Sequence, residues 1–194
     1  MSETKVIGID LGATNIRAGI VQQGSIQNIQ SKRIKSEGTV DEVLADFYLL
    51  IDALLDKEVV AIGIGVPSVV DLAKGIVYDV QHIPSWKEVP LKEILETKYK
   101  IPVFVNNDAN CFALGEFHFG KGRGKSEMIG LTIGTGLGAG AIVNKHLFAG
   151  PNCGVGEFGM VDYLEHNYEY YASGQYFSHI YNLKGEEVFE RAKA

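Results

Sequence analysis

The chain has 194 residues, of which 46% are hydrophobic and 22% charged, and its formal net charge is −6 at pH 7. This length and apolar content suffice for one large globular domain or two smaller lobes with buried cores. The negative charge argues against non-specific nucleic-acid binding, which depends on clustered cations that displace counterions. No apolar run reaches the roughly 18 residues of a membrane span, and the first residues lack the regions of a secretory signal.

The chain has two cysteines, Cys111 and Cys153, and no Cys-x-x-Cys pair. Isolated cysteines fit a reducing compartment better than a disulfide scaffold. We interpret both as small, partly buried thiols rather than nucleophiles. We expect the protein to be cytoplasmic, with no membrane or nucleic-acid partner.

Three short strands are expected at the beginning of the chain, at Lys5–Leu11, Ile16–Val21 and Ser25–Ile34. Tight turns that contain glycine separate them, and such spacing favours antiparallel pairing. A helix should follow Thr39, because Glu42 stands three residues later, as in a capping box. Apolar residues then repeat at helical spacing: Val40, Val43, Leu44, Phe47, Ile51, Leu54 and Leu55.

Helices and strands alternate in the remainder of the chain. Strands are expected at Val59–Val66, Val103–Asn106, Met128–Ile133 and Ala139–Val143. Helices are expected at Leu91–Tyr99, Ala109–Phe117, Tyr168–Tyr181 and Glu186–Lys193. Three strands followed by alternating helices and strands predict an α/β fold.

The first candidate site is the turn after the first strand, which contains Asp10, Gly12 and Thr14. Gly12 permits a tight turn in which backbone N–H groups and the Thr14 hydroxyl can face a phosphate. Asp10 could then hold Mg²⁺ through water. A hairpin with a polar turn is the alternative, because short glycine turns are common.

A second glycine-rich turn separates the strands expected at 128–133 and 139–143. Strand, glycine-rich turn and strand differ from the dinucleotide fingerprint, in which a helix follows, and the Walker pattern is absent. The backbone of this turn could wrap a phosphate, although a purely structural glycine hairpin is the alternative. The residues concerned are Thr132, Gly134, Thr135, Gly136 and Gly138.

A carboxylate and several amides follow the strand expected at 103–106. They lie where α/β sheets tend to bind ligands, at the carboxyl end of a strand. We interpret Asn106 or Asn110 as a cap of the next helix, and Asp108 as a functional carboxylate. Further on, Glu157 lies in the glycine-rich segment Gly154–Gly159, and Glu169 follows it. Such acidic groups suit sugar hydroxyls, although an isolated glutamate is usually only solvated.

Together these elements resemble the ROK family (repressor, open reading frame, kinase) of the actin-like, ribonuclease H-like ATPase superfamily. The resemblance runs from Lys5 to Gly174 and rests on five motifs: Asp10-x-Gly12-x-Thr14, Gly65-Val66-Pro67-x-x-x-Asp71, Asn107-Asp108-Ala109-Asn110, Gly134-Thr135-Gly136-x-Gly138 and Gly156-Glu157-x-Gly159. Family members phosphorylate hexoses or N-acetylhexosamines with ATP and Mg²⁺. The resemblance implies the actin-like α/β fold with two lobes.

The resemblance also assigns roles to individual residues. Asp108 matches the general base that takes the proton from the 6-hydroxyl of the sugar. Asn107, Glu157 and Glu169 match ligands of the other sugar hydroxyls. The two turns match the phosphate loops, with Asp10 beside the metal; their residues are Asp10, Gly12, Thr14, Thr132, Gly134, Thr135, Gly136 and Gly138.

The chain departs from the family pattern at two places. Many members have a His after the Glu-x-Gly segment and then a cysteine-rich zinc loop, whereas this chain has Met160 and no cysteine up to Glu169. A tetrahedral zinc needs about four N or S ligands, and only His166 is offered, so no structural zinc is expected. Met160 also removes one expected sugar contact, which weakens the assignment of glucose.

The second departure concerns the end of the chain. Family members continue with an αβ portion that carries a glycine-rich adenosine-binding segment, which this sequence lacks. We expect a lobe at 1–119 with the first phosphate loop and the catalytic carboxylate. Residues 120–194 are then the start of a truncated larger lobe, and Gly120–Lys125 is the expected hinge.

These observations favour a glucokinase-like enzyme that transfers phosphate from ATP to the 6-hydroxyl of a hexose, glucose first. A kinase for an N-acetylhexosamine or fructose remains open, as does a non-catalytic sugar-binding or regulatory module. Repressors of the family carry a helix-turn-helix segment before the first phosphate loop, and Asp10 leaves no room for one here. The resemblance also predicts a homo-oligomer.

Overall fold

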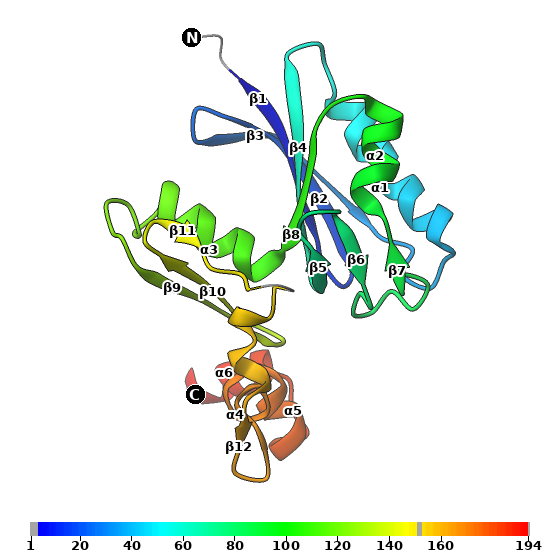
Figure 1. Ribbon diagram of the computed structural model, residues 1–194. Coiled ribbons are helices and arrows are strands. Elements are labelled where there is room, and N and C mark those ends of the chain that lie inside the picture. Colours follow the sequence, from blue (N-terminus) through cyan, green and yellow to red (C-terminus); the bar gives the residue numbers. More distant parts are fainter. Residues whose placement is uncertain (1–3, 151–152, 194) are drawn as a thin grey trace. The chain divides into compact units, whose positions relative to one another are not determined.

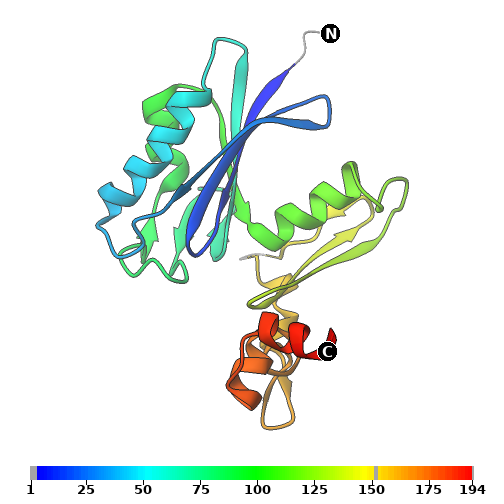
Figure 2. The same ribbon diagram turned by 180° about the vertical axis from the view of Figure 1, so that it is seen from behind.

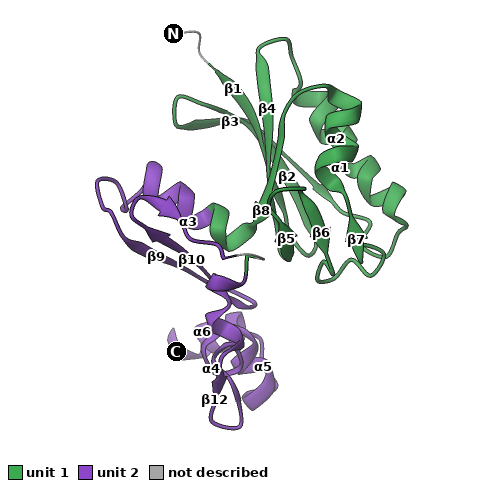
Figure 3. Cartoon of the chain, in the orientation of Figure 1, with its two compact units in different colours: residues 1–111, 151–153 green, residues 112–150, 154–194 purple. Residues whose placement is uncertain are grey.

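The computed structural model describes residues 4–150 and 153–193. The chain forms two compact units (Figure 3): unit 1 comprises residues 1–111 and 151–153, and unit 2 comprises residues 112–150 and 154–194. The division falls inside α3 (Asp108–His118), whereas the sequence suggested a boundary at 119/120. The glycines at that place end α3 instead, since the N–H groups of Gly120 and Gly122 both donate to the carbonyl of Glu116, at 3.0 Å.

A five-stranded sheet in the order β3-β2-β1-β4-β8 forms the centre of unit 1 (Figure 1). Its strands are β1 (Lys5–Leu11), β2 (Asn15–Gln22), β3 (Ser25–Arg33), β4 (Val59–Val66) and β8 (Val103–Asn107). β1, β2 and β3 pair antiparallel, while β1, β4 and β8 are parallel. The carboxyl ends of β1, β4 and β8 therefore meet at one edge, as the α/β prediction requires.

Helices α1 (Val40–Leu54) and α2 (Leu91–Tyr99) cover one face of this sheet, as Figures 1 and 2 show from opposite sides. The predicted capping box at the start of α1 is confirmed: the Glu42 N–H donates to the Thr39 hydroxyl and the Thr39 N–H to the Glu42 carboxylate. The core under the helices includes the rings of Phe47 and Trp86, which are fully buried and stacked with centroids 5.6 Å apart.

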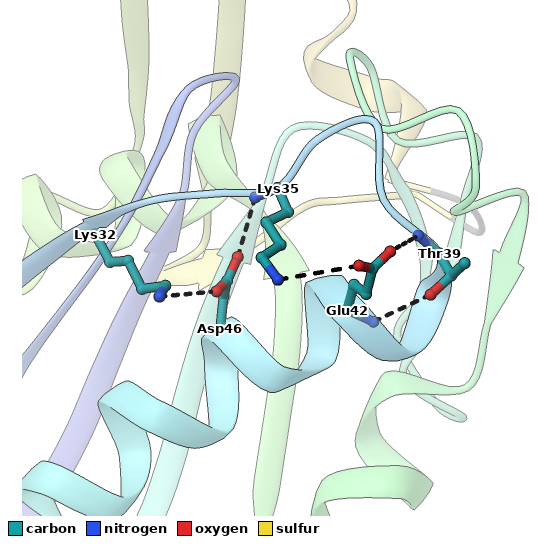
Figure 4. A network of polar contacts seen from close by, with 5 residues as sticks. All are labelled: Lys32, Lys35, Thr39, Glu42 and Asp46. Atoms are coloured by element: carbon teal, nitrogen blue, oxygen red, sulfur yellow. Dashed lines mark hydrogen bonds and ion pairs between the residues drawn. The ribbon is translucent and has the colours of Figure 1, made fainter.

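A buried carboxylate fixes the connection between β3 and α1 (Figure 4). Asp46 on α1 is 3% exposed and accepts the backbone N–H of Lys35 at 3.0 Å. Its other oxygen pairs with the Lys32 ammonium at 3.2 Å. A buried charge persists only with such partners. This network therefore fixes the connection between β3 and α1 against the helix.

A small antiparallel sheet in unit 1 has no counterpart among the predicted elements. It has the order β5-β6-β7 and consists of β5 (Val69–Asp71), β6 (Ile76–Tyr78) and β7 (Glu88–Val89). Asp71 closes the β5–β6 turn by accepting the N–H groups of Ala73 and Lys74 at 3.1 and 3.0 Å. Strands of two or three residues are too short for the periodicity that identifies strands in a sequence.

Unit 2 begins its sheet with the two predicted strands, β9 (Met128–Ile133) and β10 (Leu137–Val143), and adds β11 (His146–Leu147). The order is β11-β10-β9, all antiparallel. α3 packs closely on this sheet, because a Cβ at Gly130 would lie 3.1 Å from the Cα of Ala113. The alternate residues of β9, Ile129, Leu131 and Ile133, are 60%, 51% and 66% exposed.

The remainder of unit 2 consists of short elements. They are two 3₁₀ turns, η1 (Gly154–Gly156) and η2 (Phe158–Met160), a hairpin of β12 (Asp162–Tyr163) and β13 (His166–Asn167), and helices α4 (Tyr168–Ala172), α5 (Gln175–Tyr181) and α6 (Gly185–Lys193). The single helix predicted at Tyr168–Tyr181 is wrong in its continuity. It breaks at Ser173 and Gly174, where the Gly174 N–H donates to the carbonyl of Gly134 at 2.7 Å.

Candidate functional site

Three of the predicted motifs meet at the carboxyl edge of the unit 1 sheet. Asp10 on β1 pairs with Gly65 on β4, and Gly65 pairs with Asn106 on β8. A Cβ at Gly65 would lie 3.5 Å from both the Asp108 Cα and the Cys111 sulfur. The absence of a side chain at Gly65 therefore allows β4 to pack closely against the first turn of α3, which begins with Asp108.

The pKa of the Asp108 carboxyl is raised above its ordinary value. The main cause is desolvation by surrounding protein, although part of the side chain remains exposed; the negative charge of Asp10 adds to it. A hydrogen bond from the Ala109 N–H at 2.8 Å opposes the shift. A raised pKa makes this carboxylate a stronger base than an ordinary aspartate, which suits proton abstraction.

The amides around Asp108 shape the start of α3. Asn107 caps the helix by accepting the Asn110 N–H at 3.2 Å, so the cap is neither Asn106 nor Asn110 as the sequence suggested. Asn106 instead accepts the Asn107 N–H at 2.8 Å and the side-chain amide of Asn110 at 3.2 Å. The amide nitrogen of Asn107 lies 3.4 Å from the carbonyl of Ser68. These bonds fix the backbone from which Asp108 projects.

The first glycine-rich turn, residues 12–14, is closed by its own backbone. The Gly12 N–H donates to the carbonyl of Asn15 at 2.9 Å, and a Cβ at Gly12 would lie 3.1 Å from that oxygen. The Ile34 N–H donates to the carbonyl of Thr14 at 3.0 Å. The side chains of Ala13 and Thr14 are exposed at the tip, so the turn can meet a ligand without rearrangement of the core.

The two cysteines lie in unit 1 close to these residues. Burial, together with the charges of Asp108 and Asp10, raises the pKa of the Cys111 thiol to about 12. The Cys153 thiol is buried and donates to the carbonyl of Val70 at 3.4 Å. A thiol with so high a pKa is not a thiolate near neutral pH, which agrees with the interpretation of Cys111 as structural.

The second glycine-rich turn lies in unit 2, between β9 and β10. The Gly134 N–H donates to the carbonyl of Gly136 at 2.9 Å, and Thr132 stands opposite Gly138 in the strand register. Gly134 and Thr135 are exposed, and Gly136 is partly exposed. The predicted strand, turn and strand arrangement is therefore present, with the turn accessible.

Glu169 contacts this second turn. The Leu137 N–H, directly after the turn, donates to Glu169 Oε2 at 2.9 Å. The same oxygen is 2.7 Å from the place of a Cβ on Gly136. Sequence reasoning did not place Glu169 or Gly174 beside the turn, because their partners lie more than 30 residues away in the chain.

Glu157 lies between two glycines that pack on β10. A Cβ at Gly156 would overlap the carbonyl of Ala139, and one at Gly159 would overlap the carbonyl of Leu137. Both glycines are buried, whereas the Glu157 side chain is exposed. The Gly-Glu-x-Gly spacing therefore presents the carboxylate while its neighbours approach the strand closely.

Asp10 is suited to a magnesium ion by its chemistry. It is an exposed carboxylate beside an accessible turn, and the nearby charge of Asp108 makes the region attractive to a cation. Mg²⁺ is commonly bound through one or two carboxylates, with water and phosphate as its other ligands. Within residues 4–150 and 153–193, no group of three or more His, Cys, Asp and Glu side chains could hold a metal alone.

Comparison with known proteins identifies the family. The model of the ROK family matches residues 6–188. Glucokinase from Streptomyces coelicolor is 33% identical over 96% of this chain and 62% of its own length. The xylose repressor of Bacillus subtilis is 33% identical over 79% of the chain and 41% of its own length.

Solved structures give the same result. A ROK family glucokinase from Streptomyces griseus, in complex with glucose and AMPPNP, has a TM-score of 0.81 and 30% identity and covers 97% of this chain and 64% of its own. Lmo2764 from Listeria monocytogenes, proposed as an N-acetylmannosamine kinase, has a TM-score of 0.82 and 27% identity. The match covers 98% of this chain and 70% of the Lmo2764 chain.

The mixed α/β architecture is thus that of the actin-like ATPases, as the sequence resemblance implied. The chain belongs to the ROK family. It spans less than two thirds of the length of the glucokinase relatives, 62% for the Streptomyces coelicolor protein. In the described part of the chain, no helix is long and apolar enough to cross a membrane.

Proposed function

We propose that the chain forms the sugar-binding and catalytic part of an ATP-dependent kinase that phosphorylates the 6-hydroxyl of a hexose, with glucose as the first candidate. The observation that carries this proposal is the Asp108 carboxylate, whose raised pKa is caused by desolvation and by the nearby Asp10. The identity to glucokinases supports the kinase assignment.

In the proposed reaction, Asp108 accepts the proton of the attacking hydroxyl. A sugar hydroxyl is a poor nucleophile, and phosphoryl transfer depends mainly on alignment and charge stabilisation. A positioned base contributes about 10²–10⁴-fold. The capped start of α3 gives Asp108 the fixed position that this role needs.

Asn107, Glu157 and Glu169 would bind the remaining sugar hydroxyls. Since the carbonyl oxygen of Asn107 already accepts the Asn110 N–H and one amide N–H donates to the Ser68 carbonyl, the second amide N–H is the part suited to a sugar oxygen. The two glutamates are acceptors only, so they would orient hydroxyls that donate. This division of donors and acceptors suits a neutral polyol.

The two glycine-rich turns would receive the phosphates of ATP through backbone N–H groups. Their residues are Gly12 and Thr14 in the first turn and Thr132, Gly134, Thr135, Gly136 and Gly138 in the second. Asp10 would hold Mg²⁺ through water. When bound, the ion supplies neutralisation of phosphate charge.

A kinase for an N-acetylhexosamine or fructose is the second candidate. It is favoured by Met160, which stands where many family members have a His and which cannot bond a hydroxyl strongly, and by the similarity to Lmo2764. A sugar-binding regulator is the third, because the xylose repressor is also a relative. Homo-oligomerisation stays a prediction of the resemblance.

A coupled phosphorylation assay over a panel of hexoses and N-acetylhexosamines tests the proposal. It is run with the 194-residue chain and with a version extended to the length of the glucokinase relatives. We expect ATP- and sugar-dependent turnover, with glucose preferred, and its loss by at least about 100-fold in Asp108→Asn. Sugar binding should remain measurable in that variant.

Asp162→Asn is the matched control, since Asp162 is an exposed aspartate on β12. It should turn over sugar at the rate of the unmodified protein. Near-normal turnover by Asp108→Asn would exclude Asp108 as the base. Preference for an N-acetylhexosamine would select the second candidate, and binding of sugar without turnover in the extended version would select the third.

A further inference from the structure

Glu169 and Gly174 hold the second glycine-rich turn from its two sides. Glu169 Oε2 accepts the N–H of Leu137, which directly follows the turn, at 2.9 Å. The Gly174 N–H donates to the carbonyl of Gly134, the first residue of the turn, at 2.7 Å. Both partners belong to one short segment, because α4 begins before Glu169 and ends just before Ser173. The segment made of α4 and the two residues after it therefore contacts both ends of the turn.

The turn needs such support because its own residues supply little. Gly134 and Gly136 have no side chains to restrict the backbone, and glycine has the widest choice of conformations. Inside the turn, the bond from the Gly134 N–H to the Gly136 carbonyl is 2.9 Å. A bond to a carboxylate is stronger than one between neutral groups, so Glu169 is the more effective of the two external partners.

The helix that carries Glu169 is itself firmly held. Its N-cap is Asn167, whose side chain accepts the Tyr170 N–H at 2.9 Å. The Tyr170 ring stacks on His166 and His179, with centroids 3.8 and 4.8 Å away. A movement of α4 would therefore disturb several contacts, so the position of Glu169 is well defined.

The carboxylate of Glu169 has capacity left for a ligand. Among the described residues only Oε2 accepts a hydrogen bond, and it also lies nearer to the turn than Oε1: 2.7 and 3.9 Å from the place of a Cβ on Gly136. A carboxylate can accept about four hydrogen bonds. Oε1 can thus bind a hydroxyl while Oε2 keeps Leu137.

We propose that Glu169 is a positioning residue that couples sugar binding to the second glycine-rich turn: one oxygen binds a sugar hydroxyl while the other holds the Leu137 N–H. This inference rests on the proposed function for the identity of the ligand. A hydroxyl bound to Oε1 restricts the rotation of the side chain and so reduces the entropy lost in keeping the Leu137 bond. By linkage, an ordered turn strengthens sugar binding by the same factor.

Amide hydrogen exchange of the 194-residue chain, followed by NMR, tests the holding role without any ligand. In Glu169→Ala we expect the Leu137 amide to exchange about tenfold faster, the loss of one hydrogen bond. Glu169→Gln keeps an acceptor of the same length and should restore most of the protection. Glu165→Ala removes an exposed glutamate in the β12–β13 hairpin and is the matched control.

An internal readout shows whether α4 itself is intact in each variant. The Ser173 N–H donates to the backbone carbonyl of Glu169 at 3.0 Å, so its protection reports whether α4 persists in each variant. Unchanged Leu137 exchange in Glu169→Ala, with Ser173 still protected, would overturn the holding role. If the Leu137 and Ser173 amides both lose protection in Glu169→Ala but not in Glu169→Gln, the order of the turn still depends on the acceptor group of this side chain.

The coupling is tested by adding glucose, fructose or N-acetylmannosamine at saturation. The sugar that binds should slow Leu137 exchange by a further factor of about five, in the unmodified chain and not in Glu169→Ala. Binding itself is read from the Asn107 and Asn110 amides of unit 1. A sugar that shifts those amides and leaves Leu137 exchange unchanged would overturn the coupling while the proposed function stands. No shift with any sugar would overturn both.

Discussion

The two glycine-rich turns both connect antiparallel strands but are stabilised differently. The first joins β1 to β2 in unit 1, and the second joins β9 to β10 in unit 2. The first has the backbone bond from the Gly12 N–H to the Asn15 carbonyl and one further bond from Ile34, directly after β3. The second has the internal bond from the Gly134 N–H to the Gly136 carbonyl and is also held by Glu169 and Gly174. The first turn is thus supported by its own hairpin and the next strand, and the second by a segment more than 30 residues away in the sequence.

The largest expected effect comes from a methyl group added beside β10. In Gly156→Ala the Cβ would overlap the carbonyl of Ala139, and a backbone atom cannot move aside cheaply. We expect unit 2 to lose about 3 kcal/mol or more, measured by urea unfolding. Gly134→Ala is the control, because a Cβ there meets nothing within 4 Å. Equal stability of both variants would contradict the close packing on β10.

Asp46→Ala is the corresponding test in unit 1. It removes the acceptor of the Lys35 N–H and the partner of Lys32 at a 3% exposed position. We expect a loss of about 2 kcal/mol, with Asp46→Asn losing less because it keeps an acceptor. If the first turn is stabilised independently of the connection between β3 and α1, amide exchange of residues 12–15 should not change in either variant. Faster exchange there would show that it depends on that connection.

Paired substitutions in the turns sharpen the comparison further. Gly136→Ala places a Cβ 2.7 Å from Glu169 Oε2, a flexible side-chain end that can move away from Leu137. Gly12→Ala places one 3.1 Å from its own turn partner, the Asn15 carbonyl. Each should cost about 1 kcal/mol. Only Gly136→Ala should deprotect an amide whose acceptor lies outside the turn, namely the Leu137 amide bonded to Glu169. If only Gly12→Ala deprotected such an amide, the external support would belong to the first turn instead.

The smallest effect concerns the titration of Asp108. Because the charge of Asp10 adds to the desolvation that raises the Asp108 pKa, Asp10→Asn should lower the Asp108 pKa. The side-chain carboxyl carbon, followed by NMR in metal-free buffer, reports this directly. A pKa that does not move would remove Asp10 as a cause.

The raised pKa also has a sign for activity and stability. Asp108 is protonated up to a higher pH than an ordinary aspartate, so a rate that depends on the base falls as the pH drops through this raised pKa. Folding favours the protonated form, so stability decreases as the pH rises from the ordinary to the raised value. Because Asp10→Asn lowers the raised pKa, the fall in rate and the upper end of the pH range over which stability decreases should both move to lower pH.

The sequence predicted those elements that are long and regularly patterned. Val59–Val66 and Leu91–Tyr99 have the predicted bounds, and Thr39 with Glu42 marks the start of α1. Alternation, helical spacing and capping act over a few residues, so they can be recognised without the fold. The motifs around Asp10 and Asp108 likewise follow strands whose parallel ends meet at one edge.

What could not be predicted depends on contacts between distant segments. The helix expected at Tyr168–Tyr181 is broken because the Gly174 N–H bonds to Gly134 rather than within a helix. Asn107 rather than Asn106 or Asn110 caps α3, since the strand continues one residue further than its apolar pattern. Local patterns carry no information about such pairings.

The exposed apolar residues of β9 have a practical consequence for handling the chain. In the described part of unit 2, β9 is the outer strand of its sheet, and Ile129, Leu131 and Ile133 are more than half exposed. An edge with unpaired backbone groups and an apolar face is a template for pairing with another chain. Concentrated solutions should therefore self-associate, and Leu131→Lys should raise the soluble concentration without weakening the β9–β10 pairing.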